Sequence, residues 1–129
     1  MTTDPLERLI LDATEADRAT IAEVLGDRIG IDRSSGRVVL LPGYSPLSAR
    51  SKVLLVLLAS KAAHLLGLRE GELVRTQEVV LVSGLPAGTV APKLKELRED
   101  HLVAQGADRA YYVPNALLQR VTEQLRREE

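Results

Sequence analysis

The most constraining part of this sequence is the segment 76–97, in which two helical patterns flank a short turn that contains glycine. Residues 79–82 read Val-Val-Leu-Val, which on propensity alone would favour a β-strand. We nevertheless predict a helix over 76–83, because Thr76 is a good N-cap, an acid occupies the first turn and Ser-Gly closes the segment. The segment therefore predicts two consecutive helices.

The second of these helices is expected over about 89–101, with Thr89 as its N-cap. Its apolar residues share one face at helical spacing, and they are Val90, Leu94 and Leu97. Pro92 would occupy the third helical position, where its missing N–H has no acceptor within the helix. The proline is thus expected to fix the start of this helix and not to interrupt it.

A small hairpin and a final helix are predicted next. Strand, turn and strand patterns follow one another over 102–113, and a brief strand over 72–74 is expected to pair with this hairpin. Asn115 is suited to cap a C-terminal helix. The inner face of that helix is expected to carry Leu117, Leu118, Val121 and Leu125.

A long helix is predicted upstream, over about 48–66, with Gly67 closing it. The centre of this helix, residues 53–59, is apolar on all sides and not on one stripe. Such a helix must be covered on several sides. The N-terminal segment, a second subunit or both together could supply this cover.

The first 45 residues are expected to form a small α+β extension to a domain that spans 46–129. Asp4 and Pro5 predict the start of a short helix to Leu11, and Thr14 is expected to cap a second helix. Alternating apolar residues on both sides of Ser-Ser-Gly predict a β-hairpin over 29–41. The chain is therefore expected to be mainly α with a small amount of β.

One stretch resembles the winged helix-turn-helix superfamily, in particular the MarR-like and PadR-like transcriptional regulators. Their recognition helix opens with Gly-Thr-apolar-x-Pro-x-Leu-x-x-Leu, which Gly88, Thr89, Val90, Pro92, Leu94 and Leu97 match. Ala91 stands where PadR-like proteins usually carry an aromatic residue. The resemblance covers roughly residues 48–125. It implies a DNA-binding regulator of transcription with a recognition helix at about 89–101 and a wing at about 102–113.

The resemblance directs attention to residues that such a protein would turn toward double-stranded DNA. Ala91 and Pro92 are placed to touch a thymine methyl group, while lysines at 93 and 95 would reach phosphate or guanine. Arg109 lies on the expected wing, from which it would reach the DNA backbone. Thr76 and Thr89 are expected at the N-termini of their helices, and a helix N-terminus attracts phosphate. The full set of candidate DNA-binding residues is Arg50, Lys52, Thr76, Thr89, Ala91, Pro92, Lys93, Lys95 and Arg109.

The same residues also fit an ordinary solvated helix face of mixed charge. Glu96 and Glu99 would repel phosphates if they pointed into a groove. The alternative hypothesis is therefore a protein-interaction module that uses the same fold without binding DNA. A DNA reader is expected to gather its candidate cations on one continuous surface.

Composition narrows the remaining classes of function. The absence of cysteine excludes disulfides and thiolate metal sites, and the formal net charge of −1 does not by itself indicate a nucleic-acid partner. His64 and His101 have no partner at a recognised catalytic spacing, so we expect no enzyme, no metal and no cofactor. The longest apolar run, 53–59, is far shorter than the roughly 20 residues that cross a bilayer. We expect a cytoplasmic homodimer that does not associate with membranes.

Overall fold

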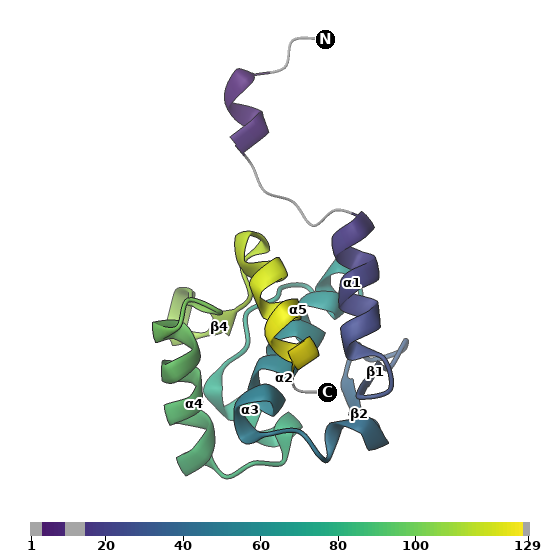
Figure 1. Cartoon of the computed structure of the whole chain (residues 1–129), viewed down its shortest axis with the longest axis vertical. Helices are drawn as coiled ribbons and strands as arrows, with labels where there is room; N and C mark the ends of the chain where they lie inside the picture. Colours follow the sequence, from purple (N-terminus) through teal and green to yellow (C-terminus); the bar gives the residue numbers. More distant parts are fainter. Residues whose placement is uncertain (1–3, 10–14, 128–129) are drawn as a thin grey trace.

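A computed structural model describes residues 4–9 and 15–127 of the chain (Figure 1). The fold is mainly helical with a small amount of antiparallel β-structure, as the sequence predicts. The helices are η1 (Pro5–Leu9), α1 (Glu15–Leu25), η2 (Pro42–Tyr44), α2 (Ala49–Leu65), α3 (Thr76–Ser83), α4 (Ala87–Glu99), η3 (Ala107–Arg109), η4 (Asn115–Leu117) and α5 (Leu118–Arg127). The strands are β1 (Ile29–Ile31), β2 (Val38–Leu40), β3 (Ala104–Gln105) and β4 (Tyr111–Tyr112).

The long apolar helix α2 forms the centre of the molecule, with α4 on one side of it and α1 on the other (Figure 1). It begins at Ser48, whose hydroxyl accepts a hydrogen bond from the Ser51 N–H, and it ends before Gly67, which has a φ of 75°. Every side chain from Val53 to Ala59 is fully buried. Helices α1, α3, α4 and α5 and both hairpins supply the cover. A single chain therefore covers α2 without a second subunit.

Helices α3 and α4 follow one another through a tight turn, as predicted. Gly84 adopts the left-handed conformation with a φ of 75°, and its N–H bonds to the Val80 carbonyl. Glycine is favoured there because it has no Cβ to clash in this conformation. The capping prediction for Thr76 was wrong, because the helix is already formed at this residue and Arg75 precedes it as the N-cap.

The start of α4 also differs from the prediction. Pro86 is the N-cap, and its carbonyl accepts from the N–H groups of Thr89 and Val90, so Thr89 lies inside the helix and is not its cap. A proline is tolerated at this position because an N-cap residue needs no intrahelical N–H bond. Pro92 is consequently the sixth helical residue, and the helix loses the hydrogen bond that residue 92 would donate to the Gly88 carbonyl. The helix ends at Glu99, before His101 at a φ of 58°.

The predicted C-terminal hairpin is present and is extended by a third short segment. Strands β3 and β4 are antiparallel, with Gln105 opposite Tyr111. Val74 forms an isolated bridge to Tyr111, in which each N–H donates to the other residue's carbonyl over 2.8 Å. The spatial order is therefore Val74, β4, β3, which agrees with the pairing predicted for 72–74.

The N-terminal part forms η1, α1 and the predicted hairpin of β1 and β2, in which Gly30 is opposite Val39. The Asp4 carboxylate accepts a hydrogen bond from the Leu6 N–H over 2.9 Å, so Asp4 caps the first turn as expected. The predicted continuation of this turn to Leu11 and the cap at Thr14 lie outside the described residues.

Helix α5 packs against α1 and α2, and it buries Leu118, Val121 and Leu125. The short turn η4 precedes it and contains Leu117, which is half-buried. The apolar face of this C-terminal helix is thus covered within the chain. Both apolar surfaces that suggested a dimer are therefore accounted for in one molecule.

Candidate nucleic-acid interface

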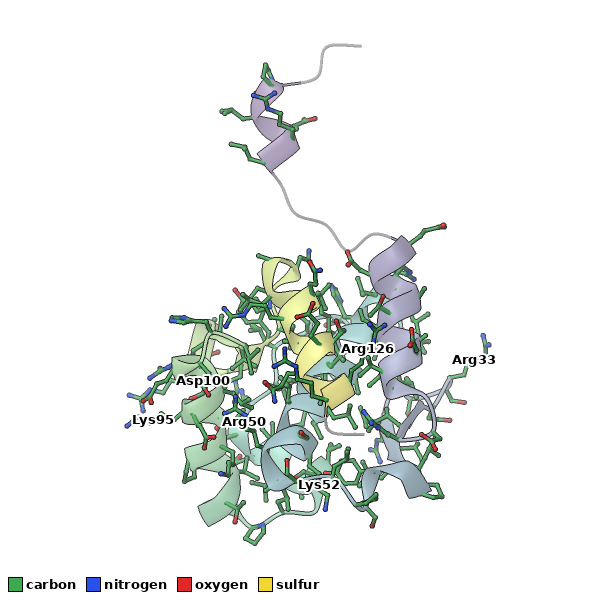
Figure 2. All side chains as sticks on the ribbon, viewed as in Figure 1. Arg33, Arg50, Lys52, Lys95, Asp100 and Arg126 are labelled. Atoms are coloured by element: carbon green, nitrogen blue, oxygen red, sulfur yellow. The ribbon has the colours of Figure 1, made fainter. Side chains whose placement is uncertain are left out.

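Helix α4 presents one face to the core and the opposite face to solvent. Val90, Leu94 and Leu97 are fully buried, which agrees with the predicted inner face. The outer face carries Ala91, Pro92, Lys95 and Glu99, all of which are exposed. In Figure 2 the Lys95 side chain points away from the body of the molecule. The predicted recognition helix thus has an accessible outer surface that combines small, basic and acidic side chains.

One flank of α4 is occupied by ion pairs with α2. Arg50 lies 2.7 Å from Asp100 (Figure 2). Arg50 also donates to Glu96 over 2.7 Å, and Lys93 lies 3.2 Å from Glu96. The hydrogen bonds from Arg50 and then from Lys93 hold the pKa of the Glu96 carboxyl below its usual range. Arg50 and Lys93 therefore neutralise Glu96 of α4, and Arg50 also pairs with Asp100 just after the helix.

This network changes the charge balance predicted for the outer surface. Glu96 was expected to repel phosphates, but its charge is compensated by two cations. The same contacts engage two of the cations that were expected to reach DNA. Asp100 was missed as a partner for Arg50, because the two residues are 50 positions apart and only the packing of α2 on α4 brings them together.

A second hydrogen-bond chain joins α4 to the hairpin. Arg98 donates to the side chain of Gln105 over 2.6 Å, and Gln105 donates to the Arg109 carbonyl over 3.2 Å. Arg75, which precedes α3, lies 3.5 Å from Asp108 at the hairpin tip. The hairpin is thereby held beside α4 and the start of α3. Arg98 was not among the predicted candidates, although a basic residue in the last turn of the recognition helix was a usable signal.

Arg109 is exposed at the hairpin tip, where both it and Asp108 have a positive φ. The described residues include no ion-pair partner for Arg109 or for Lys95 within the fold. Two of the predicted cations, one on α4 and one on the hairpin, therefore remain accessible to an external anion.

Lys52 lies away from this surface. Its ammonium nitrogen is 5.3 Å from the centroid of the Tyr44 ring, a distance typical of a cation–π contact. Tyr44 is buried and donates to the Ser83 carbonyl over 2.8 Å, and burial raises the pKa of its hydroxyl to about 12. Figure 2 places Lys52 apart from the group formed by Lys95, Arg50 and Asp100.

The fold thus places the nine candidate DNA-binding residues in separate groups. Ala91, Pro92 and Lys95 share the outer face of α4, Arg109 lies on the adjacent hairpin, and Arg50 and Lys93 lie on the flank with paired acids. Thr76 and Thr89 are half-buried in the first turns of their helices. The accessible basic surface is smaller than the predicted one.

Comparisons with known proteins add no assignment, because no family model matches the chain and neither the curated proteins nor the solved structures include a match. Among residues 4–9 and 15–127, no helix is long and apolar enough to cross a membrane. Any assignment of function therefore depends on the geometry of α4 and the hairpin.

Proposed function

We propose that residues 49–127 form a winged helix-turn-helix domain that binds double-stranded DNA, as in a regulator of transcription. Helix α4 would enter the major groove, and the hairpin of β3 and β4 would act as the wing. The observation that carries this proposal is the exposed outer face of α4 beside a hairpin that Arg98 and Gln105 tie to it. A helix that only faced solvent would not need a hairpin held beside it by hydrogen bonds.

The backbone at the start of α4 adds to the proposal. The first N–H groups of a helix and its positive dipole end favour a phosphate. Gly88 is exposed there, and a Cβ added to it would meet no atom within 4 Å, so a DNA backbone has room to approach closely. The positive end of α4 is therefore open on the side that the proposal turns toward DNA.

The available charge predicts weak, salt-sensitive binding. Lys95, Arg98 and Arg109 are exposed cations on or beside the outer face of α4. Because each phosphate contact contributes about −0.9 to the slope of log K against log salt, three contacts predict a slope of about −2 to −3. This small slope distinguishes the proposal from an extensively basic DNA binder.

Replacing Lys95 by Ala is expected to weaken binding to random-sequence duplexes and to make the salt slope shallower by about one unit. Fluorescence anisotropy over a salt series measures both quantities. Arg33→Ala removes the same charge from an exposed residue in the turn between β1 and β2, far from α4 (Figure 2), and should leave both quantities unchanged. Equal effects of the two variants, or no binding of the unaltered protein at about 50 mM salt, would overturn the proposal.

Replacing Glu99 by Gln is expected to strengthen DNA binding. Glu99 is exposed on the outer face of α4, where its charge opposes phosphates. At low salt we expect an affinity gain of about threefold to tenfold, in line with removal of one like-charge contact near the surface. Ser34→Lys adds one positive charge at an exposed residue in the turn between β1 and β2, and it should produce a smaller gain. A larger gain from Ser34→Lys would contradict the placement of α4 against DNA.

A protein-interaction module is the second candidate, and an exposed apolar surface favours it. Leu81 on α3 is 83% exposed, and the neighbouring strand β2 exposes Val39 and Leu40. Large apolar side chains exposed on neighbouring elements favour a protein contact over a fully solvated surface. If the protein is an interaction module, Leu81→Glu is expected to weaken binding to its protein partner, whereas Lys95→Ala is not. The opposite outcome is expected if the protein acts by binding DNA.

A further inference from the structure

The N-terminal turn η1 exposes apolar side chains that no part of the described chain covers. Leu6 and Leu9 are 67% and 68% exposed, and η1 contains no buried residue. In Figure 1 the turn stands clear of the rest of the described chain. A five-residue 3-10 helix has too few internal hydrogen bonds to persist alone in water. The stable form of this segment therefore requires an apolar surface to pack against.

The rest of the fold contains an apolar groove that matches the exposed leucines of η1. It has a volume of about 340 Å³ and lies between α1, β1 and the end of α2. Its walls are mainly aliphatic and include Ile21, Leu25, Ile29, Ala62 and Leu65. Because a cavity of about 150 Å³ holds one benzene molecule, this groove has room for two leucine side chains.

The rim of the groove fits the rest of the segment. Arg18 lines the groove and donates through two guanidinium nitrogens to the Leu65 carbonyl, each over 3.3 Å. Glu7 and Arg8 lie between the two leucines in the sequence, and Glu7 carries the charge opposite to that of Arg18. Ala22 and Leu66 also line the groove, and Leu66 is 58% exposed. The groove therefore offers apolar contact at its base and an ion-pair partner at its edge.

We propose that the groove of one molecule receives η1 of a second copy of this chain, and that the exchange is reciprocal. The η1 turn of one chain stands clear of its own body, so it is available to another molecule (Figure 1). Reciprocal exchange buries two identical contacts around a twofold axis, which is the commonest symmetry of homo-oligomers. The proposal does not rest on DNA binding, and its tests measure association alone.

Sedimentation velocity of the full chain over a range of concentrations tests this proposal. The unaltered protein is expected to dimerise, and Leu6→Glu with Leu9→Glu should weaken the dimer by at least tenfold for each docked leucine lost, roughly as apolar burial predicts. Leu73→Glu introduces a glutamate at an exposed leucine between α2 and α3, outside the groove, and should leave the dimer intact. A monomer at all concentrations, or equal weakening by Leu73→Glu, would overturn the proposal.

Mixing two defective variants separates reciprocal exchange from other dimers. Ala22→Glu places a charge in the groove at an exposed helical position and should also yield a monomer. A mixture of Ala22→Glu with the Leu6→Glu, Leu9→Glu variant retains one intact turn and one intact groove, so it should form a heterodimer weaker than the unaltered dimer. Failure of the mixture to associate would contradict the exchange.

A disulfide test identifies whose groove is occupied. The chain has no cysteine, so Leu9→Cys with Ala22→Cys introduces the only thiols. Under oxidising conditions a covalent dimer on a non-reducing gel supports exchange between copies. A disulfide closed within one chain would show that η1 occupies its own groove, and it would overturn the proposal.

Discussion

Replacing Glu72 by Gln is expected to lower the free energy of unfolding by about 2–4 kcal/mol, because it removes the counter-charge of a buried ammonium group. Lys61 is only 1% exposed in the middle of the molecule, and its nitrogen lies 3.0 Å from a carboxylate oxygen of Glu72. The variant keeps the size of the side chain and an oxygen acceptor, so the loss reports mainly on charge. Urea denaturation measures the change.

Two further variants show whether the unpaired buried charge causes the loss of stability. Glu70→Gln makes the same chemical change at an exposed residue two positions away and should alter stability by less than about 0.5 kcal/mol. Adding Lys61→Met to Glu72→Gln removes the unpaired ammonium and should restore most of the lost stability. If Glu72→Gln and Glu70→Gln have equal effects, the ion pair makes no net contribution.

Replacing Gly36 by Ala is expected to destabilise the protein by about 2–5 kcal/mol through two costs. Gly36 has a φ of 71°, a conformation that L-residues with a Cβ rarely adopt. A Cβ at this position would also collide with the Leu68 carbonyl oxygen, where the hairpin of β1 and β2 meets the end of α2. Thermal or urea unfolding measures the sum of the two costs.

Two other glycines separate these costs. Gly67 has a φ of 75° but open space around it, so Gly67→Ala should show the conformational cost of about 1 kcal/mol without the collision. Gly71 has neither a positive φ in the left-handed region nor a neighbour within 4 Å, so Gly71→Ala should have little effect. Similar losses at Gly36 and Gly67 would show that the hairpin moves away from Leu68 at little cost.

Local patterns in the sequence predicted most of the secondary structure. Helical spacing of Val90, Leu94 and Leu97 correctly assigned the inner face of α4, and the Ser-Gly stop outweighed the strand propensity of residues 79–82. The error at Thr89 arose because threonine is a stronger N-cap than proline on average. The backbone instead starts the helix at Pro86, whose carbonyl already accepts helical hydrogen bonds.

The candidate site was less predictable, because its charges are set by contacts between distant parts of the chain. A helical wheel correctly places Lys95 outside, but it cannot show that Arg50 reaches across from α2 to Glu96 and Asp100. The cover of α2 was left open between two sources, and the fold assigns it to the same chain. Spacing along one helix is readable from sequence, whereas partners on another helix depend on packing.

The position of Pro92 has a mechanical consequence for α4. The missing hydrogen bond lies between residues 88 and 92, and both are on the solvent side of the helix. On the opposite side, Val90 and Leu94 are held in the core. Because helices bend most readily where proline interrupts the bonding ladder, a bend in α4 is expected to open on its exposed side at residues 88–92. Val90 and Leu94 would keep the buried side of the helix in place, so the core limits how far such a bend can go.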